Sequence, residues 1–132
     1  MSADIAVVLD ATALTAYVEG RVAVGELVAE VADQGRQVAV PAVCLAAAQA
    51  NVRSDIDAAL LRLLMTTPVV RLLPLSGNDA EETGVLARAA GADLAVGHAV
   101  QVALAHEAHY VTTRPTEAAK ALPGNWSILT LD

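Results

Sequence analysis

The chain has 132 residues and a formal net charge of −7, and 55% of its residues are hydrophobic. No apolar run approaches the roughly 18 residues needed to span a bilayer. The acidic balance, the scattered basic residues and the 2% aromatic content are untypical of proteins that bind nucleic acid tightly by its phosphates. We therefore expect one cytoplasmic domain over residues 1–132, without membrane contact and with part of its apolar surface buried in an interface.

The first half of the chain predicts two strands and four helices. Unbroken apolar runs predict buried strands, and apolar residues at helical spacing predict amphipathic helices. In chain order these are a strand at 5–9, helices at 12–19 and 24–33, a strand at 37–40 and a helix at 42–52. Ser54–Asp57 resembles a capping box and predicts the start of a further helix. The apolar face of that helix is expected to consist of Ile56, Ala59, Leu60, Leu63 and Leu64.

The second half continues the alternation of strands and helices. Asp93 is placed to cap the longest helix of this half. The predicted elements are a strand at 69–73, a helix ending near Ala90, a helix at 94–107, a strand at 110–112, a short helix at 116–121 and a strand at 128–131. This alternation predicts a three-layer α/β/α fold around a central, mainly parallel sheet of four or five strands, because parallel neighbours need crossover connections.

Polar residues follow two of the predicted strands. Ligands of parallel sheets bind beyond the carboxyl ends of the strands. Asp10 directly follows the first strand, and Thr112 and Arg114 end the fourth. We therefore expect the functional site around these residues.

Several common motifs are missing. A dinucleotide-binding fold would have a glycine-rich turn after the first strand, where this chain has Asp10–Ala13. No phosphate-binding loop with its lysine is present either. Cys44 is the only cysteine and stands in an apolar segment, so we interpret it as a core residue. His106 and His109 are three residues apart and could grip a metal, but polar residues at a solvated helix end are the simpler interpretation.

The segment at residues 7–14, with Asp10 at its centre, resembles the opening of a PIN domain. Residues 40–47, 97–105 and 110–114 are similar, in the same order, to the second strand and following helix, the later acidic helix and the fourth strand of that family. The resemblance covers nearly the whole chain. It implies a metal-dependent nuclease fold used by many toxin components of toxin–antitoxin pairs, with RNA as a target and an antitoxin-like protein as a partner.

The family's chemistry, as the resemblance implies it, needs three or four carboxylates that hold Mg²⁺ or Mn²⁺. Asp10 fills the first acidic position and is the expected catalytic and metal-binding residue, and Thr12 supplies the hydroxyl two residues later. The other positions depart from the pattern. Ala47 stands at the second acidic position, His98 at the third and Arg114 at the last, while Thr112 keeps the strand-end hydroxyl.

Arg114 and the missing carboxylates weaken the implied metal site. A single carboxylate would hold Mg²⁺ weakly. At ~5 Å and an effective dielectric constant near 20, the arginine would repel each positive charge of the cation by about 3 kcal/mol. It would instead suit an ion pair with Asp10. Alternatively, Asp93 and His98 complete a site with Asp10, and the imidazole would favour Mn²⁺ or Zn²⁺. A plain helix cap is the simpler role for Asp93.

Two hypotheses follow. The favoured one is a degenerate PIN-like module, non-catalytic or weakly active and without a required cofactor, which binds a partner protein or itself. The alanine-rich helix that begins at Ala42 suits close packing in a homodimer. The alternative is an active, divergent metal-dependent endoribonuclease that uses Asp10 with Asp93 and His98.

Overall fold

The computed structural model describes residues 4–131, so Met1–Ala3 and Asp132 at the ends of the predicted domain lie outside the described residues. Within that range the chain forms a five-stranded sheet in the order β3-β2-β1-β4-β5, and every neighbouring pair is parallel. This confirms the predicted α/β class. The strands are β1 (Ile5–Leu9), β2 (Gln37–Pro41), β3 (Val70–Leu73), β4 (His109–Thr112) and β5 (Ile128–Thr130).

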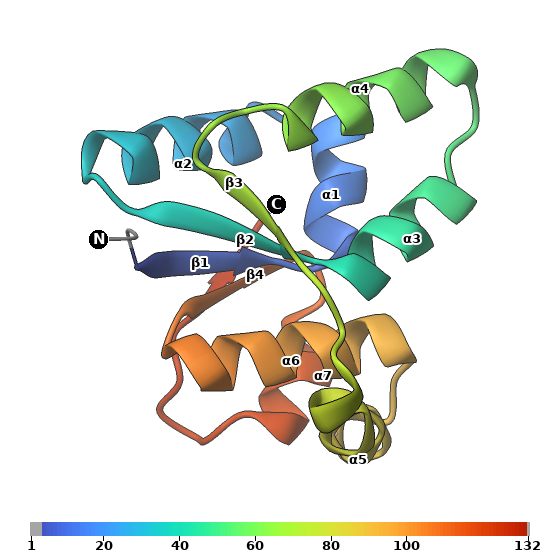
Figure 1. The fold of residues 1–132 in the computed structure, drawn as a ribbon, viewed down its shortest axis with the longest axis vertical. Helices are drawn as coiled ribbons and strands as arrows, with labels where there is room; N and C mark the ends of the chain where they lie inside the picture. Colours follow the sequence, from blue (N-terminus) through green and yellow to red (C-terminus); the bar gives the residue numbers. More distant parts are fainter. Residues whose placement is uncertain (1–3, 132) are drawn as a thin grey trace.

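Helices cover both faces of the sheet and complete the predicted three layers (Figure 1). One layer holds α1 (Ala11–Val18), α2 (Val22–Asp33), α3 (Ala42–Ala50) and α4 (Asp55–Met65). The other holds α5 (Ala80–Ala90), α6 (Leu94–His106) and α7 (Pro115–Ala121), with the short turn η1 (Gly77–Asp79) before α5. Among residues 4–131 no helix is both long enough and apolar enough to cross a membrane.

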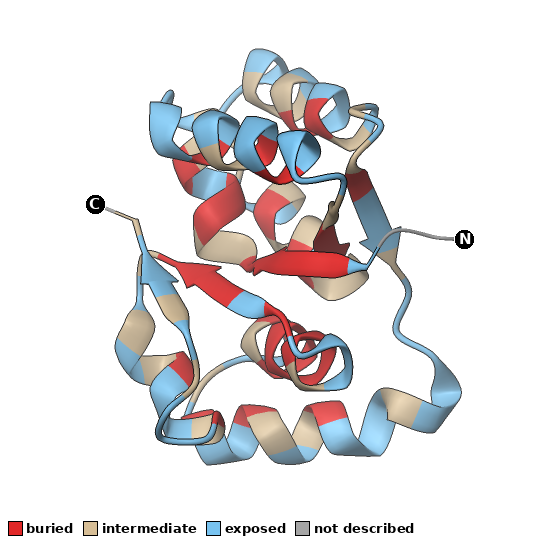
Figure 2. Ribbon diagram, turned by 90° about the vertical axis from the view of Figure 1, so that its left-hand side faces the viewer, coloured by how far each residue is buried: buried red, intermediate tan, exposed pale blue. Residues whose placement is uncertain are grey.

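The core lies at the centre of the sheet and along α6 (Figure 2). All five residues of β1 are buried, as expected for a parallel strand covered on both faces. Helix α6 is enclosed between the sheet and α5. Gly97 permits this packing, because a Cβ atom there would lie 2.3 Å from the carbonyl oxygen of Thr83 in α5.

Helix α4 begins as predicted but turns a different face inward. Ser54 caps it by accepting a hydrogen bond from the backbone N–H of Asp57. Ile56 and Leu63, which were expected inside, are 74% and 59% exposed, and the buried residues are Leu61 and Leu64. The predicted buried face was right for Leu64 and wrong for Ile56 and Leu63, because apolar residues occur on every side of this helix. Its contacts with α1 and β3 decide which side is covered.

Candidate functional site: a buried aspartate below a groove between α1 and α3

Asp10 sits at the junction of three elements, as the strand-end rule predicted. It follows β1 directly, and its backbone N–H donates to the carbonyl of Val111 in the neighbouring strand β4. Its side chain also caps α1, because Oδ1 accepts a hydrogen bond from the backbone N–H of Ala13 at 2.9 Å. The strand end and the helix start therefore fix the carboxylate in one position.

Hydroxyl groups surround the carboxylate of Asp10. The Thr12 hydroxyl donates to Oδ1 at 2.6 Å, and the Tyr110 hydroxyl donates to Oδ2 at 3.2 Å. The hydroxyls of Thr12 and Thr112 lie 3.1 Å apart. Since the single proton of Thr12 goes to Asp10, Thr112 must be the donor of this pair. Asp10 is only 2% exposed, so protein donors take the place of water around it.

The turn after β4 is attached to the same hydroxyls. The backbone N–H of Thr113 donates to Thr12 Oγ1 at 2.8 Å, and that of Arg114 donates to Thr112 Oγ1 at 2.9 Å. The Thr12 hydroxyl thus makes one donor and two acceptor interactions, which is its full capacity. Both lone pairs of Asp10 Oδ1 are also used. This hydroxyl network leaves few oxygen lone pairs for a cation.

Two ionisable groups beside Asp10 stay neutral. Burial, together with the charge of Asp10, raises the pKa of the Tyr110 phenol far above its usual range, so the phenol remains a hydrogen-bond donor. Burial also raises the pKa of the Cys44 thiol, with Asp10 again contributing. Cys44 Sγ donates to the carbonyl of Ala95 at 3.1 Å. Cys44 is therefore a core residue that links α3 to α6, not a reactive thiolate.

Arg114 does not form the anticipated ion pair with Asp10. Across residues 4–131 the ion pairs are Arg21 with Glu19 and Arg36 with Asp4. The backbone of Arg114 is held by Thr112, and its side chain lines a hollow of about 380 Å³ between α1 and α3. Its guanidinium is thus free to meet a ligand in that hollow.

Four of the predicted site residues line this hollow together: Thr12, Ala47, Asp93 and Arg114. Asp93 is exposed and caps α6 by accepting from the backbone N–H of Val96 at 3.1 Å, which confirms the simpler interpretation of this residue. Asp10 and Thr112 lie directly beneath and reach the hollow through the hydroxyl of Thr12. His98 is not part of its wall.

His98 performs a different task in the structure. It is 1% exposed, and its Nδ1 accepts a hydrogen bond from the backbone N–H of Val43 at 3.3 Å. Helix α3 begins after Pro41, which offers no side-chain cap, so the imidazole from α6 satisfies one of the free N–H groups of α3. We therefore regard His98 as a helix cap supplied by another helix.

The groups that act on the pKa of His98 belong to the segment that follows β3. Nε2 has no hydrogen-bond partner among the described residues. Burial lowers the pKa of His98, while the carbonyl of Pro74 and the charge of Asp79 act in the opposite direction. Pro74 and Asp79 both follow β3, whereas Asp10 follows β1. The groups that act on His98 are therefore not those of the Asp10 network.

The residues of this site do not fit a divalent metal ion held by carboxylates. Among residues 4–131, no three His, Cys, Asp or Glu side chains come close enough to share a metal ion. Mg²⁺ and Mn²⁺ need several accessible oxygen ligands. Here Asp10 is buried and already hydrogen-bonded by Thr12, Tyr110 and Ala13, and the exposed Asp93 caps α6. We derive no catalytic step through a metal.

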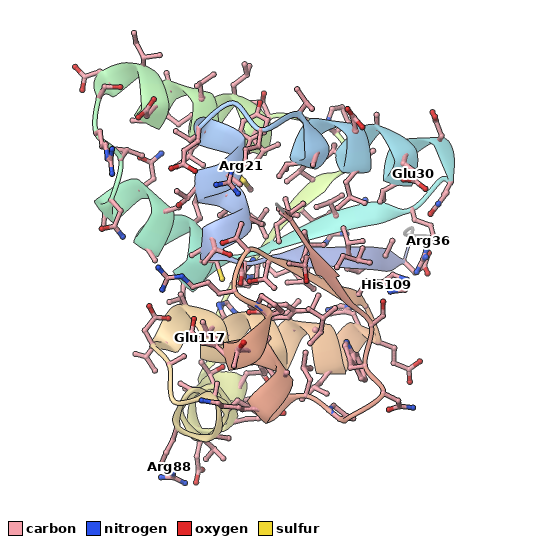
Figure 3. All side chains as sticks on the ribbon, turned by 180° about the vertical axis from the view of Figure 1, so that it is seen from behind. Arg21, Glu30, Arg36, Arg88, His109 and Glu117 are labelled. Atoms are coloured by element: carbon pink, nitrogen blue, oxygen red, sulfur yellow. The ribbon has the colours of Figure 1, made fainter. Side chains whose placement is uncertain are left out.

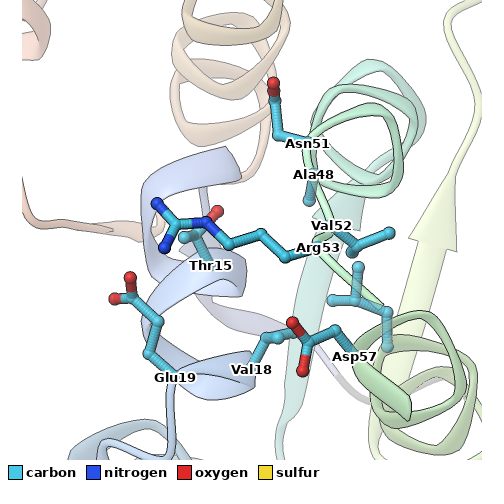
Figure 4. A pocket seen from close by; sticks show the side chains of 9 residues that line it. Thr15, Val18, Glu19, Ala48, Asn51, Val52, Arg53 and Asp57 are labelled. Carbon is cyan, nitrogen blue, oxygen red and sulfur yellow. The ribbon is translucent and has the colours of Figure 1, made fainter. Parts of the chain in front are cut away.

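A second hollow, of about 540 Å³, adjoins the first and is shown in Figure 4. The two share Thr15, Glu19, Ala48 and Asn51, and together they form what we call the α1–α3 groove. Its inner end is lined by Thr12, Asp93 and Arg114, and its outer end by Val52, Arg53, Asp57 and Leu61.

Two features of this site were not predicted from the sequence. Arg21, Arg53 and Arg114 are far apart in the chain, yet all three line the α1–α3 groove, and Figure 3 shows Arg21 well away from Arg88 at the far end of α5. Tyr110 was predicted to lie in a strand, but no role in the site was predicted for it. Strand periodicity does place Tyr110 and Thr112 on one face of β4, which is the signal that identifies Tyr110 as a neighbour of Asp10.

No protein-family model matches the sequence, and no curated protein matches it. Solved structures do match the fold. VapBC2 from Rickettsia felis, crystallised with a DNA fragment from their promoter, superposes with a TM-score of 0.68 at 15% identity, over 97% of this chain and 99% of that one. PAE2754 from Pyrobaculum aerophilum superposes with a TM-score of 0.64 at 18% identity, over 94% and 88%.

The class of protein follows from this likeness together with the sheet order. The chain has a PIN-like fold, which confirms the fold that the sequence resemblance implied. Among the solved structures that share this fold is VapBC2 from Rickettsia felis.

Proposed function

We propose that this chain is a degenerate PIN-like domain of the toxin type, which acts by binding a partner and does not cleave RNA. The observation that supports this most is the hydroxyl network of Asp10. Its carboxylate is buried, and its hydrogen-bonding capacity is directed to Thr12, Ala13 and Tyr110. Arg114 lines the neighbouring hollow at a position where the resemblance would place another carboxylate.

The experiment is a comparison of metal binding and RNA cleavage by the purified chain. We expect no rise in melting temperature with Mg²⁺, Mn²⁺ or Zn²⁺, because a ligand stabilises a protein only in proportion to its binding to the folded state. We also expect no cleavage of single-stranded RNA with any of the three ions. Differential scanning fluorimetry and gel analysis of labelled RNA provide these readouts.

A matched variant shows whether the assay is sensitive enough. Ala47 and Arg114 line the same hollow as Asp93, so the double substitution Ala47→Glu with Arg114→Asp returns two carboxylates to that hollow. We expect this variant to gain stabilisation by Mn²⁺. RNA cleavage by the natural chain that requires Mn²⁺ and disappears in Asp10→Asn would contradict the proposal and support a divergent nuclease with Asp10 as its metal ligand.

We infer that the partner is an antitoxin-like protein. The similarity to VapBC2 supports this choice, because that structure contains the two-component VapBC2 assembly. The chain's net negative charge and its low aromatic content of 2% argue for a protein partner over RNA.

We also propose a homodimer through the outer face of α3. That helix contains no charged residue, and Val43, Ala46 and Ala47 line an apolar hollow whose rim includes Leu94, which is 59% exposed. In a two-fold dimer, a side chain and the hollow beside it can each meet the other in the second copy.

We expect Leu94→Glu to convert a dimer to a monomer, because the charge would be buried without a counterion. Light scattering after gel filtration measures the mass. Leu72→Glu, at an exposed leucine of the edge strand β3, is the control. A monomeric natural chain, or a dimer that the Leu94→Glu substitution leaves intact, would refute this interface.

A further inference from the structure

We propose that the α1–α3 groove binds a segment of the partner protein that carries an acidic side chain, with that carboxylate against Arg114 and an apolar side chain at the outer end. This inference rests on the proposed function, since it assigns a ligand to the same site. Asp10 is buried and therefore does not present its charge to a ligand in the groove. The residue that follows β4 and lines the inner end is Arg114, which carries a positive charge.

Arg114 is the group at the inner end that is best suited to an anion. Its backbone is fixed by Thr112, and its guanidinium has no carboxylate partner within the described part of the chain. Guanidinium groups bind carboxylates through two parallel hydrogen bonds. The hydroxyl of Thr12 cannot compete for this role, because its proton is donated to Asp10. An acidic side chain is therefore the complementary ligand at this end.

The outer end offers both a charge and an apolar surface. Arg53 reaches across the hollow toward α1, while Glu19 and Asp57 border it from two sides (Figure 4). Val18, Val52 and Leu61 provide apolar contacts at the same end. A leucine-like side chain can cover them while the polar rim stays solvated.

The groove suits a peptide better than a nucleic acid strand. No aromatic side chain lines it, so bases would find no stacking platform. Glu19, Asp57 and Asp93 lie among its three arginines and would repel successive phosphates of a nucleic acid strand. A peptide with a single carboxylate has to place only that one group beside Arg114, in the hollow that Asp93 also lines. The groove therefore favours a ligand with one negative charge over a strand with many.

The test is a nitrogen–proton correlation NMR titration of the full chain with three probes. The first is the peptide acetyl-Leu-Gly-Gly-Asp-amide, the second is its lysine counterpart acetyl-Leu-Gly-Gly-Lys-amide, and the third is a single-stranded oligouridine. We expect the aspartate peptide to shift the amide signals of Thr113, Arg114 and Arg53 in a saturable way. Arg114→Ala should weaken that binding about 10-fold, as expected for the loss of a charge-assisted contact.

Two further variants make the outcome specific. Arg88→Ala removes an exposed arginine at the far end of α5 and should leave the affinity unchanged (Figure 3). Arg114→Glu should reverse the preference toward the lysine peptide. The inference is overturned if the natural chain binds the lysine peptide equally well, if oligouridine binds more tightly than the peptide, or if no peptide shifts these signals. None of these results involves metal or cleavage, so they are distinct from a failure of the proposed function.

Discussion

Replacement of Asp10 by alanine should lower the free energy of unfolding by about 3 kcal/mol. The substitution removes the cap of α1, which typically contributes about 1 kcal/mol. It also leaves the hydroxyls of Thr12 and Tyr110 without their common acceptor, and each unsatisfied buried donor costs about 1 to 3 kcal/mol. Urea unfolding followed by circular dichroism measures the change. A functional metal ligand in a cluster of acids would behave in the opposite way, because its removal relieves repulsion between like charges.

Asp93→Ala is the matched control for Asp10→Ala. Both residues cap a helix by accepting a backbone N–H, but Asp93 is exposed and binds no hydroxyl. We expect Asp93→Ala to cost about 1 kcal/mol, the value of a cap alone. Asp10→Asn should fall between the two, because an amide can still accept from Ala13. If Asp10→Ala costs no more than Asp93→Ala, the hydroxyl network does not stabilise the fold as argued here.

The alternation of apolar runs and amphipathic stretches predicted the sheet and the position of Asp10 well. That success has a local cause. A buried parallel strand such as β1 is an unbroken apolar run, and the residue after it must lie at the carboxyl edge of the sheet. The neighbour relation of β1 and β4, which brings Thr112 to Asp10, is not a local property. The strand order of the structure shows it.

The surroundings of His98 could not be predicted in the same way. Helix α6 is buried on almost every side, so its sequence contains no polar face that would indicate its rotation about its own axis. The family resemblance placed His98 at an acidic position of the site, whereas tertiary packing places its Nδ1 against Val43 at the start of α3. Likewise, the meeting of Arg21, Arg53 and Arg114 depends on how α1 and α3 pack. The spacing of residues in the sequence does not indicate how these two helices pack.

Removal of the His98 side chain should be as harmful as the loss of Asp10. We expect His98→Ala to lower the free energy of unfolding by about 3 kcal/mol, because a large buried side chain is lost and a cavity remains. The N–H of Val43 also loses its acceptor, and α3 has no other side-chain cap. His109→Ala is the control, since that residue is exposed at the start of β4. Equal effects of the two substitutions would contradict the capping role.

Low pH should lower the free energy of unfolding, because it protonates His98. Burial lowers the pKa of His98 below its ordinary value of 6.5, so the unfolded chain binds this proton more readily than the folded one. The stability that neutral His98 contributes is therefore complete above that value and decreases as the pH falls toward the folded-state pKa. Each pKa unit between the two states corresponds to about 1.4 kcal/mol. Protonation would also turn Nδ1 into a donor that faces the N–H of Val43.

Two variants isolate this contribution from that of the carboxylates. In His98→Gln the difference in stability from the natural chain should shrink as the pH is lowered below 6.5, since glutamine does not titrate. In Asp79→Asn the loss of stability on acidification should extend to lower pH. The charge of Asp79 raises the pKa of His98, so its removal lowers the folded-state pKa further. Urea titrations at several pH values provide the measurement. A constant difference between the natural chain and His98→Gln across this range would mean that burial does not hold His98 neutral.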